Sequence, residues 1–131
     1  MYFATSALAR KVEKLAIESW KKVNLSPSHG YLLMLVIENP GIQPSALSAE
    51  LHLEPSTITR LIDKLEDKKY VARTTDGRLT NVYPSPKAKE MYSRMKHCMS
   101  EFYEQYGAIL GREETARLVQ SMNRISDKMG Q

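Results

Sequence analysis

A short helix followed at once by a tight hairpin constrains the fold of this chain more than any other feature of its sequence. The stretch EPSTITRLIDKLEDKKY, residues 54–70, carries apolar residues at helical spacing on one face. Pro55 suits the first turn of that helix, where the missing amide hydrogen of proline is not needed. The next run, YVARTTDGRLTNVYP, has β-prone segments on both sides of Asp76-Gly77, two residues that tolerate the positive φ of a tight turn. The sequence therefore predicts a small β-hairpin attached to a helical core.

A second short helix precedes this one. It runs from Pro44 to Leu51, and a brief turn at His52 and Leu53 leads into the helix at Pro55. Two helices joined in this way are typical of a helix-turn-helix, whose second helix enters the major groove of DNA. The hairpin that follows would then be a wing. Candidate DNA contacts on the second helix and the wing are Ser56, Thr57, Thr59, Arg60, Lys64, Gly77 and Arg78.

The residue types at these positions suit contacts with DNA. Ser56 and Thr57 have short side chains, so the start of the helix can approach phosphates and bases closely. Arg60 can donate two hydrogen bonds to a guanine edge, a contact that gives about 1–3 kcal/mol of base discrimination. Gly77 lets the hairpin tip pass close to DNA, and Arg78 beside it could enter a minor groove.

Long helices with apolar seams are predicted on both sides of this central region. They cover about residues 2–23, 86–110 and 113–129, and Ser26-Pro27 begins a further helix between the first of them and the helix-turn-helix. A lone protomer of 131 residues would struggle to bury all three seams, so association through them is expected. The candidate interface residues are Leu8, Val12, Leu15, Phe102, Ile109, Leu118, Met122 and Ile125.

Composition places weak limits on partners and location. The formal net charge is +4, which permits a nucleic-acid partner, although residues 54–78 contain six basic and five acidic residues, a net of only +1. The longest apolar run, YLLMLVI, is too short to cross a bilayer, and no signal peptide is visible. The single cysteine, Cys98, suits a reducing compartment. We expect a cytoplasmic protein that does not interact with a membrane.

Three stretches of the chain resemble the MarR family of transcriptional regulators: LSPSHGYLLMLV, LSAELHLEPSTITRLIDKLEDKKYVAR and DGRLTNVYPSPKAKE. The likeness covers about residues 8–129. It implies a mainly α fold with a small β-hairpin wing, in which residues 25–85 form a winged helix-turn-helix lobe and residues 1–24 and 86–131 form a helical dimerisation region. By position, the resemblance also implies that Ser56, Thr57, Thr59 and Arg60 contact the major groove, that Ser45 touches backbone, and that Asp76 and Arg78 belong to the wing.

The family resemblance also raises the question of an effector. Many members release DNA when a small, often aromatic, anion binds between the dimer helices and the DNA lobe. Residues on segments that could line such a pocket are Trp20, His29, Tyr31 and Met34, although aromatic and methionine side chains at this spacing also suit a core. Gly30, inside a predicted helix, marks either close packing or added room.

Redox and metal sensing find less support. Cys98 lies on an apolar seam, where a buried and inert thiol is expected, whereas the peroxide-sensing branch of the family has its reactive cysteine in the first helix. The three histidines, His29, His52 and His97, are far apart and form no metal-binding spacing. We therefore expect no metal and no cofactor.

The sequence favours a dimeric, sequence-specific transcriptional regulator that acts as a repressor at a pseudo-palindromic operator. A small aromatic or anionic effector would relieve the repression. The alternative is a winged-helix protein-interaction module without specific DNA binding. Its support is the weak local charge and the short wing, TTDGRLTN, which lacks one of the paired arginines of the family. An enzyme is not expected, because the chain has no Gly-rich phosphate loop, nucleophile–base pairing or catalytic residues at a recognisable spacing.

Overall fold

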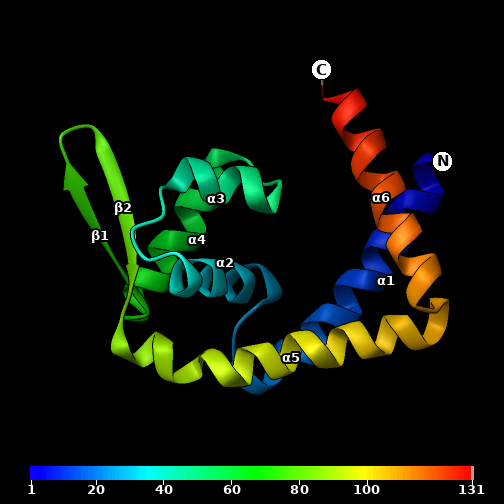
Figure 1. Ribbon diagram of the computed structural model, residues 1–131, viewed down its shortest axis with the longest axis horizontal. Helices are drawn as coiled ribbons and strands as arrows, with labels where there is room; N and C mark the ends of the chain where they lie inside the picture. Colours follow the sequence, from blue (N-terminus) through cyan, green and yellow to red (C-terminus); the bar gives the residue numbers. More distant parts are fainter. Residues whose placement is uncertain (131) are drawn as a thin grey trace.

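Within residues 1–130, which the computed structural model describes, the chain forms six α-helices and one antiparallel hairpin (Figure 1). In chain order the elements are α1 (Tyr2–Trp20), the 3₁₀ turn η1 (Lys21–Val23), α2 (Pro27–Glu38), α3 (Pro44–Leu51), α4 (Pro55–Asp67), β1 (Val71–Asp76), β2 (Leu79–Pro84), α5 (Pro86–Leu110) and α6 (Arg112–Met129). The predicted fold class, mainly α with a β-hairpin wing, is confirmed.

The helix starts follow from local capping chemistry. Proline occupies the first turn of α2, α3, α4 and α5. The Ser26 hydroxyl accepts a hydrogen bond from the His29 amide at 3.3 Å, and the Ser85 hydroxyl accepts one from the Ala88 amide at 3.2 Å. Each serine satisfies one amide that the first turn of a helix leaves free. These starts were readable from the sequence because they depend only on neighbouring residues.

The main hydrophobic core surrounds α2. Leu32, Leu33 and Val36 of this helix are fully buried, and α4, α3, β2 and α5 pack around it. Fully buried side chains from those four elements are Ile58 and Leu65 from α4, Leu47 from α3, Val82 from β2 and Met95 from α5. This packing fixes the position of α4 relative to the hairpin.

The hairpin is anchored at its base and free at its tip. Val71 pairs with Pro84 at the base and Asp76 pairs with Leu79 at the tip. A third segment extends the sheet, since the Val82 amide donates to the Ile42 carbonyl at 3.0 Å. The turn residues are therefore Gly77 and Arg78, and Gly77 has a φ of +63°. The sequence prediction, which put the turn at Asp76-Gly77, was wrong by one residue, because the strand register is set by the packing of Val82 in the core.

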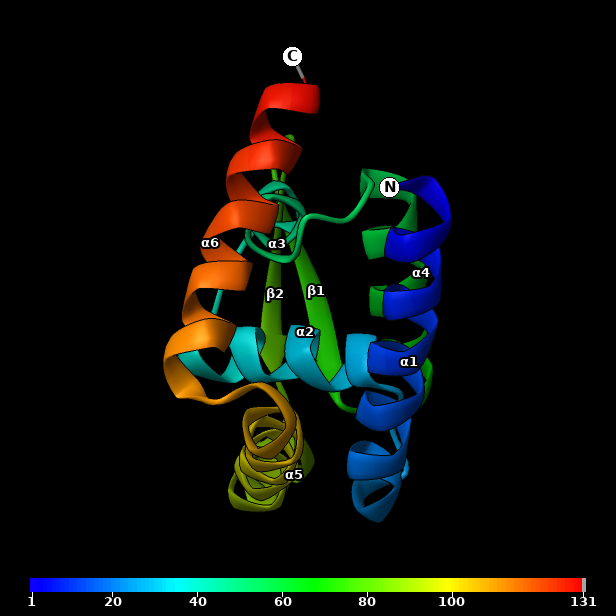
Figure 2. The same ribbon diagram turned by 90° about the vertical axis from the view of Figure 1, so that its right-hand side faces the viewer.

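Helices α1, α5 and α6 form an arm beside this core. α5 runs along one side of the molecule, and α6 turns away from its end at Gly111 (Figure 1). Figure 2 shows α1 and α6 as separate rods on either side of α5. The predicted seams on α1 and α6 are largely exposed, with Val12, Met122 and Ile125 each showing 42–43% of their surface.

No helix of residues 1–130 is long and apolar enough to cross a membrane.

Candidate nucleic-acid interface

The two faces of α4 differ sharply. Ile58, Leu61, Ile62 and Leu65 are buried against the core. The opposite face carries the predicted contact residues: Thr57 is half-buried, and the exposed ones are Ser56, Thr59, Arg60 and Lys64. The burial of the apolar face therefore presents the predicted contact residues to solvent, as binding to DNA would require.

Hydrogen bonds orient part of this exposed face. Arg60 donates from Nη2 to the Thr57 hydroxyl at 3.3 Å, which holds the guanidinium along the start of the helix. The Thr59 hydroxyl donates to the Pro55 carbonyl at 3.1 Å, so its proton is already used within the helix. Arg60 forms no ion pair with any carboxylate of residues 1–130. Its guanidinium is thus oriented and available for an acceptor outside the chain.

One contact on α4 was not predicted from the sequence. Arg73, on β1, donates from Nη2 to Asp63 and to Glu66 of α4, the second at 2.9 Å. The Arg73 amide also donates to Glu66 at 3.2 Å. These bonds join β1 to α4, and the two carboxylates share the single positive charge of Arg73. No sequence spacing could have paired them, because the contact depends on how β1 crosses α4.

The same contacts shift the protonation of the participating groups. The pKa of the Glu66 carboxyl is lowered from its ordinary 4.5, first because Arg73 donates a side-chain hydrogen bond to it. The pKa of the Arg73 guanidinium is raised by its hydrogen bonds to Glu66 and then to Asp63. At neutral pH Glu66 and Arg73 are therefore both charged, and their contact is an ion pair.

The remaining predicted contacts lie on α3 and at the wing tip. Ser45 is exposed in the first turn of α3. Asp76, Gly77 and Arg78 are exposed at the end of the hairpin, which projects away from the helices (Figure 1). Gly77 has no neighbour within 4 Å of where a Cβ would stand, so its role is the positive φ of the turn.

The four predicted effector residues do not share one environment. Trp20 is fully buried and Met34 is 4% exposed, and both belong to the core. A Cβ on Gly30 would lie 2.3 Å from the Trp20 ring, which identifies this glycine as a close-packing residue. Tyr31 packs beside Trp20 with ring centroids 5.1 Å apart, and His29 is half-buried with its Nδ1 hydrogen-bonded to Ser26. None of the four predicted residues lines the hollow described next.

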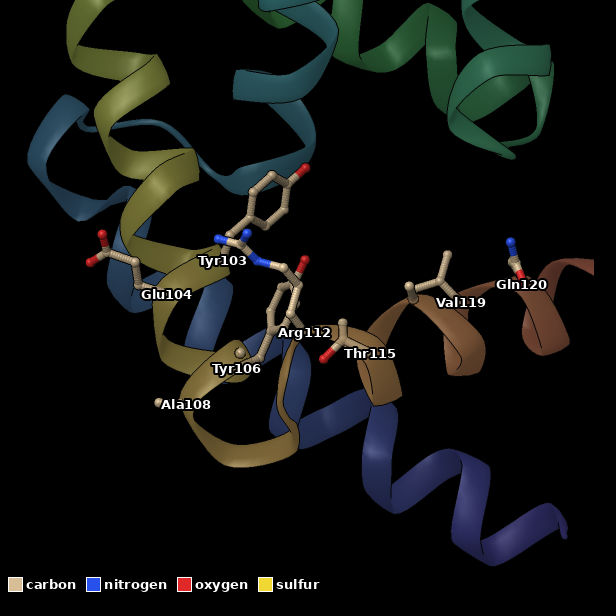
Figure 3. A pocket seen from close by; sticks show the side chains of 10 residues that line it. Tyr103, Glu104, Tyr106, Ala108, Arg112, Thr115, Val119 and Gln120 are labelled. Atoms are coloured by element: carbon tan, nitrogen blue, oxygen red, sulfur yellow. The ribbon is translucent and has the colours of Figure 1, made fainter.

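A hollow of about 810 Å³ lies at the elbow between α5 and α6 (Figure 3). Tyr103 and Tyr106 from α5 form one wall, with ring centroids 5.5 Å apart. Arg112 and Thr115 come from the first turn of α6. Burial, and then the nearby Tyr103, raise the pKa of Tyr106, so its phenol is neutral at physiological pH. No sequence pattern predicted this hollow, because it depends on the angle between α5 and α6.

The predicted dimer residues are unequally exposed. Ile109 exposes 76% of its surface, and Leu8, Val12, Met122 and Ile125 expose 42–43%. Leu15 and Leu118 are half-buried. Phe102 is only 8% exposed and packs edge-on against Tyr106 at 5.0 Å between ring centroids. Phe102 therefore offers little surface to a partner, and its side chain belongs mainly to the protomer.

Cys98 is buried in the core, and burial raises the pKa of its thiol. A raised pKa keeps the thiol protonated, which disfavours reaction with oxidants. Within residues 1–130 no cluster of three histidine, cysteine or acidic residues is arranged to hold a metal ion.

Comparison with known proteins finds similarity to one family. Residues 23–78 match the model described as "MarR family". The chain is 28% identical over 68 residues to the HTH-type transcriptional repressor MdtR of Bacillus subtilis (strain 168), which covers 52% of this chain and 44% of that protein. It is 24% identical over 97 residues to a putative transcriptional regulatory protein for the hcr operon of Thauera aromatica, covering 72% and 58%. The chain thus spans about half the length of the curated relatives it matches.

Solved structures share the whole fold. The repressor CouR bound to p-coumaroyl-CoA superposes with a TM-score of 0.83 at 19% identity, covering 96% of this chain and 91% of that one. A putative MarR-family regulator from Listeria monocytogenes, complexed with 26mer DNA, superposes with a TM-score of 0.79 at 17% identity, covering 98% and 88%. At these identities the likeness establishes the fold.

Proposed function

Because residues 23–78 belong to the MarR family, we propose that this chain is a dimeric transcriptional regulator that binds a specific DNA sequence. Residues 25–85 would form the DNA-binding lobe, and residues 1–24 and 86–131 the dimerisation region. The family is one of transcriptional regulators and not of enzymes, so the function is expected to lie in binding.

The observation that carries the proposal is the exposed polar face of α4. Arg60 is held toward the start of the helix by Thr57 and has no acidic partner among residues 1–130, so it is placed to donate to a guanine edge. The hydroxyl of Ser56 and the ammonium of Lys64 are placed for phosphate or base-edge contacts, and the Thr59 oxygen can accept from a base edge. Ser45, in the first turn of α3, would touch the backbone beside them.

The wing would add contacts in the adjacent minor groove. Arg78 stands at the hairpin tip itself, since the turn residues are Gly77 and Arg78. A tip arginine is well placed for the narrow, electronegative minor groove of A·T-rich DNA. Asp76 closes the strand pairing below it and would hold the turn in shape.

The exposed seams support a homodimer. α6 buries none of its residues within the protomer, although Leu118, Met122 and Ile125 form an apolar stripe along it. Such a stripe, continued by Leu8 and Val12 of α1 and Ile109 of α5, suits a second copy of the same chain. A symmetric dimer would present two α4 helices to half-sites about 34 Å apart, which predicts a pseudo-palindromic operator.

The proposal also includes repression of transcription and the relief of that repression by an effector. The dimer would occupy a promoter and block polymerase, as the name of the repressor MdtR suggests for that relative. A small aromatic or anionic effector would bind at the elbow of α5 and α6, where a hollow of about 810 Å³ has aromatic walls and Arg112 at its edge. Burial, and then the nearby Tyr103, raise the pKa of the Tyr31 phenol. Tyr31 therefore lies near this hollow and would connect it to α2 and the proposed DNA-binding lobe.

Selection from random duplex DNA, with sequencing of the bound fraction at moderate salt, tests the proposal. We expect an enriched palindrome with half-sites one helical turn apart. Arg60→Ala should then weaken binding to that operator by about 1–3 kcal/mol and change binding to random DNA much less. The matched control is Arg124→Ala, which removes an exposed arginine of α6.

The alternative function predicts a different result. A winged-helix protein-interaction module would enrich no sequence and would show at most weak, salt-sensitive DNA binding. Equal losses on operator and random DNA in Arg60→Ala would mean that Arg60 contacts a phosphate and does not read a base.

A further inference from the structure

Two hollows on one side of α5 form a groove that the proposed DNA and effector sites do not use. The first, of about 330 Å³, lies between η1, Tyr70 and the first half of α5. The second, of about 300 Å³, lies farther along α5 toward Cys98. Both are lined by Lys22 and Arg94, so they are neighbouring compartments, and we refer to the two together as the groove.

Basic side chains dominate the first compartment. Lys22, Lys87 and Arg94 line it together with a single acidic residue, Glu90. Glu90 and Arg94 are four residues apart on α5, a spacing that permits an ion pair, but none forms between them. Arg94 has no carboxylate partner anywhere in residues 1–130, so its guanidinium is free to donate hydrogen bonds to a bound anion.

The two lysines are already held in place. Lys22 pairs with Glu101 at 2.6 Å, and this contact raises the pKa of its ammonium, which stays protonated. Lys87 donates to the Lys68 carbonyl at 2.9 Å and lies 4.4 Å from the centre of the Tyr70 ring. Ordering of these long side chains before binding lowers the entropy that a ligand would have to overcome.

The lining also has apolar and neutral polar parts. Val23 and Met91 are buried and form the floor. Asn24, held in a left-handed conformation at the end of η1, and Tyr70 place an amide and a phenol on the rim. Fixed cations, neutral donors and an apolar floor suit an anion that can accept several hydrogen bonds at once, which is the chemistry of a phosphate group.

We propose that this groove binds a small anion of the phosphate class, with Arg94 as its main contact and Lys22 and Lys87 as supporting charges. The groove is lined by η1, Tyr70 and the first half of α5. α5 itself runs on the opposite side of the molecule from α3 and the hairpin tip (Figure 1). DNA held by α4 and the wing is therefore not the ligand. None of the residues that line the groove is among the proposed dimer contacts, which lie on α1, the second half of α5 and α6. This inference does not rest on the proposed DNA binding.

Calorimetric titration of the full chain with inorganic pyrophosphate, at ionic strength kept constant with sodium chloride, tests the site. We expect one saturable event per chain. Arg94→Gln should weaken it roughly tenfold or more, the loss expected when charge-assisted hydrogen bonds are removed. Glu90→Gln should strengthen it, because it removes the one carboxylate of the compartment. The matched control is Arg124→Gln on α6, which should leave binding unchanged.

Three results would overturn the assignment. The first is the absence of saturable binding at millimolar pyrophosphate, with each variant shown to be folded by its thermal melt. The second is an equal loss in Arg94→Gln and Arg124→Gln, which would indicate general charge attraction. The third concerns the source of the phosphate: if a short random duplex displaces pyrophosphate and loses affinity in Arg94→Gln by the same factor, the groove binds nucleic-acid backbone and not a small anion.

Discussion

Replacing Arg73 by glutamine tests whether ion pairs hold the hairpin against α4. In the folded chain the Arg73 guanidinium donates to Asp63 and Glu66 of α4, and only its backbone amide would keep a bond to Glu66 in the variant. The substitution keeps a polar side chain of similar reach and removes the positive charge. Asp63 and Glu66 would then lose their partner.

The magnitude follows from the exposure of the three groups. The side chains of Arg73, Asp63 and Glu66 are 28%, 52% and 40% exposed, so water and salt screen their attraction. Exposed ion pairs contribute about 0.2–1 kcal/mol each. Loss of both pairs should therefore lower the free energy of unfolding by about 0.5–2 kcal/mol, with the larger value at low salt.

The stability difference between wild type and Arg73→Gln should also depend on pH. The pKa of Glu66 is lower in the folded chain than its ordinary 4.5, chiefly through the hydrogen bond from Arg73. Its contribution to stability is therefore complete above pH 4.5 and is lost as the pH falls through the folded-state pKa. The stability difference between wild type and Arg73→Gln should be constant near neutral pH and should shrink in acid.

Urea unfolding followed by the fluorescence of Trp20 measures this difference, since Trp20 is the one tryptophan of the chain and is fully buried. Arg78→Gln is the control, because it removes an exposed arginine from the same hairpin. A double-mutant cycle with Glu66→Gln should show that the two losses are less than additive. Additive losses, or a stability difference that persists unchanged in acid, would refute the ion-pair account.

Three further substitutions test other parts of the structure. Gly30→Ala should destabilise the fold by about 1–3 kcal/mol in urea, because its Cβ would lie 2.3 Å from the Trp20 ring. The stability of the wild-type chain should fall between neutral and mildly acid pH, and His29→Gln should remove this fall. The folded-state pKa of His29 is lowered from 6.5 by burial and then by two nearby lysines, so the unfolded chain takes up the proton first as pH falls. Ile125→Glu should convert the proposed dimer into monomers in analytical ultracentrifugation, because it places a charge on the apolar stripe of α6.

Each of these has a matched control. Gly107→Ala adds a methyl group to another helical glycine with open space around it, so it should stabilise the chain by up to about 1 kcal/mol. His52→Asn replaces an exposed histidine at a left-handed backbone position, a conformation that asparagine also adopts. The loss of stability at mildly acid pH should remain in this variant. Asn123→Glu adds the same charge to the other side of α6 and should leave the dimer intact. A monomer from Asn123→Glu, or a dimer from Ile125→Glu, would contradict the assignment of the stripe.

The sequence by itself determined the elements and their order. Proline in the first turn marked the starts of α2, α3, α4 and α5, with a capping serine before it at α2 and α5. Apolar spacing separated the buried from the exposed face of α4. These features depend on residues within a few positions of one another, where backbone propensity and hydrogen bonding act directly. For the same reason the polar face with Arg60 could be predicted, since a helix that buries one side must expose the other.

Only the tertiary structure decided how distant residues meet. It paired Arg73 with two carboxylates of α4, placed the hairpin turn at Gly77-Arg78, and showed that Gly30 is needed for contact with Trp20. The elbow hollow of α5 and α6 and the basic groove beside Arg94 arise in the same way. Each depends on the angle and register at which two elements cross. That geometry is set by the packing of the whole core, and local sequence does not contain it.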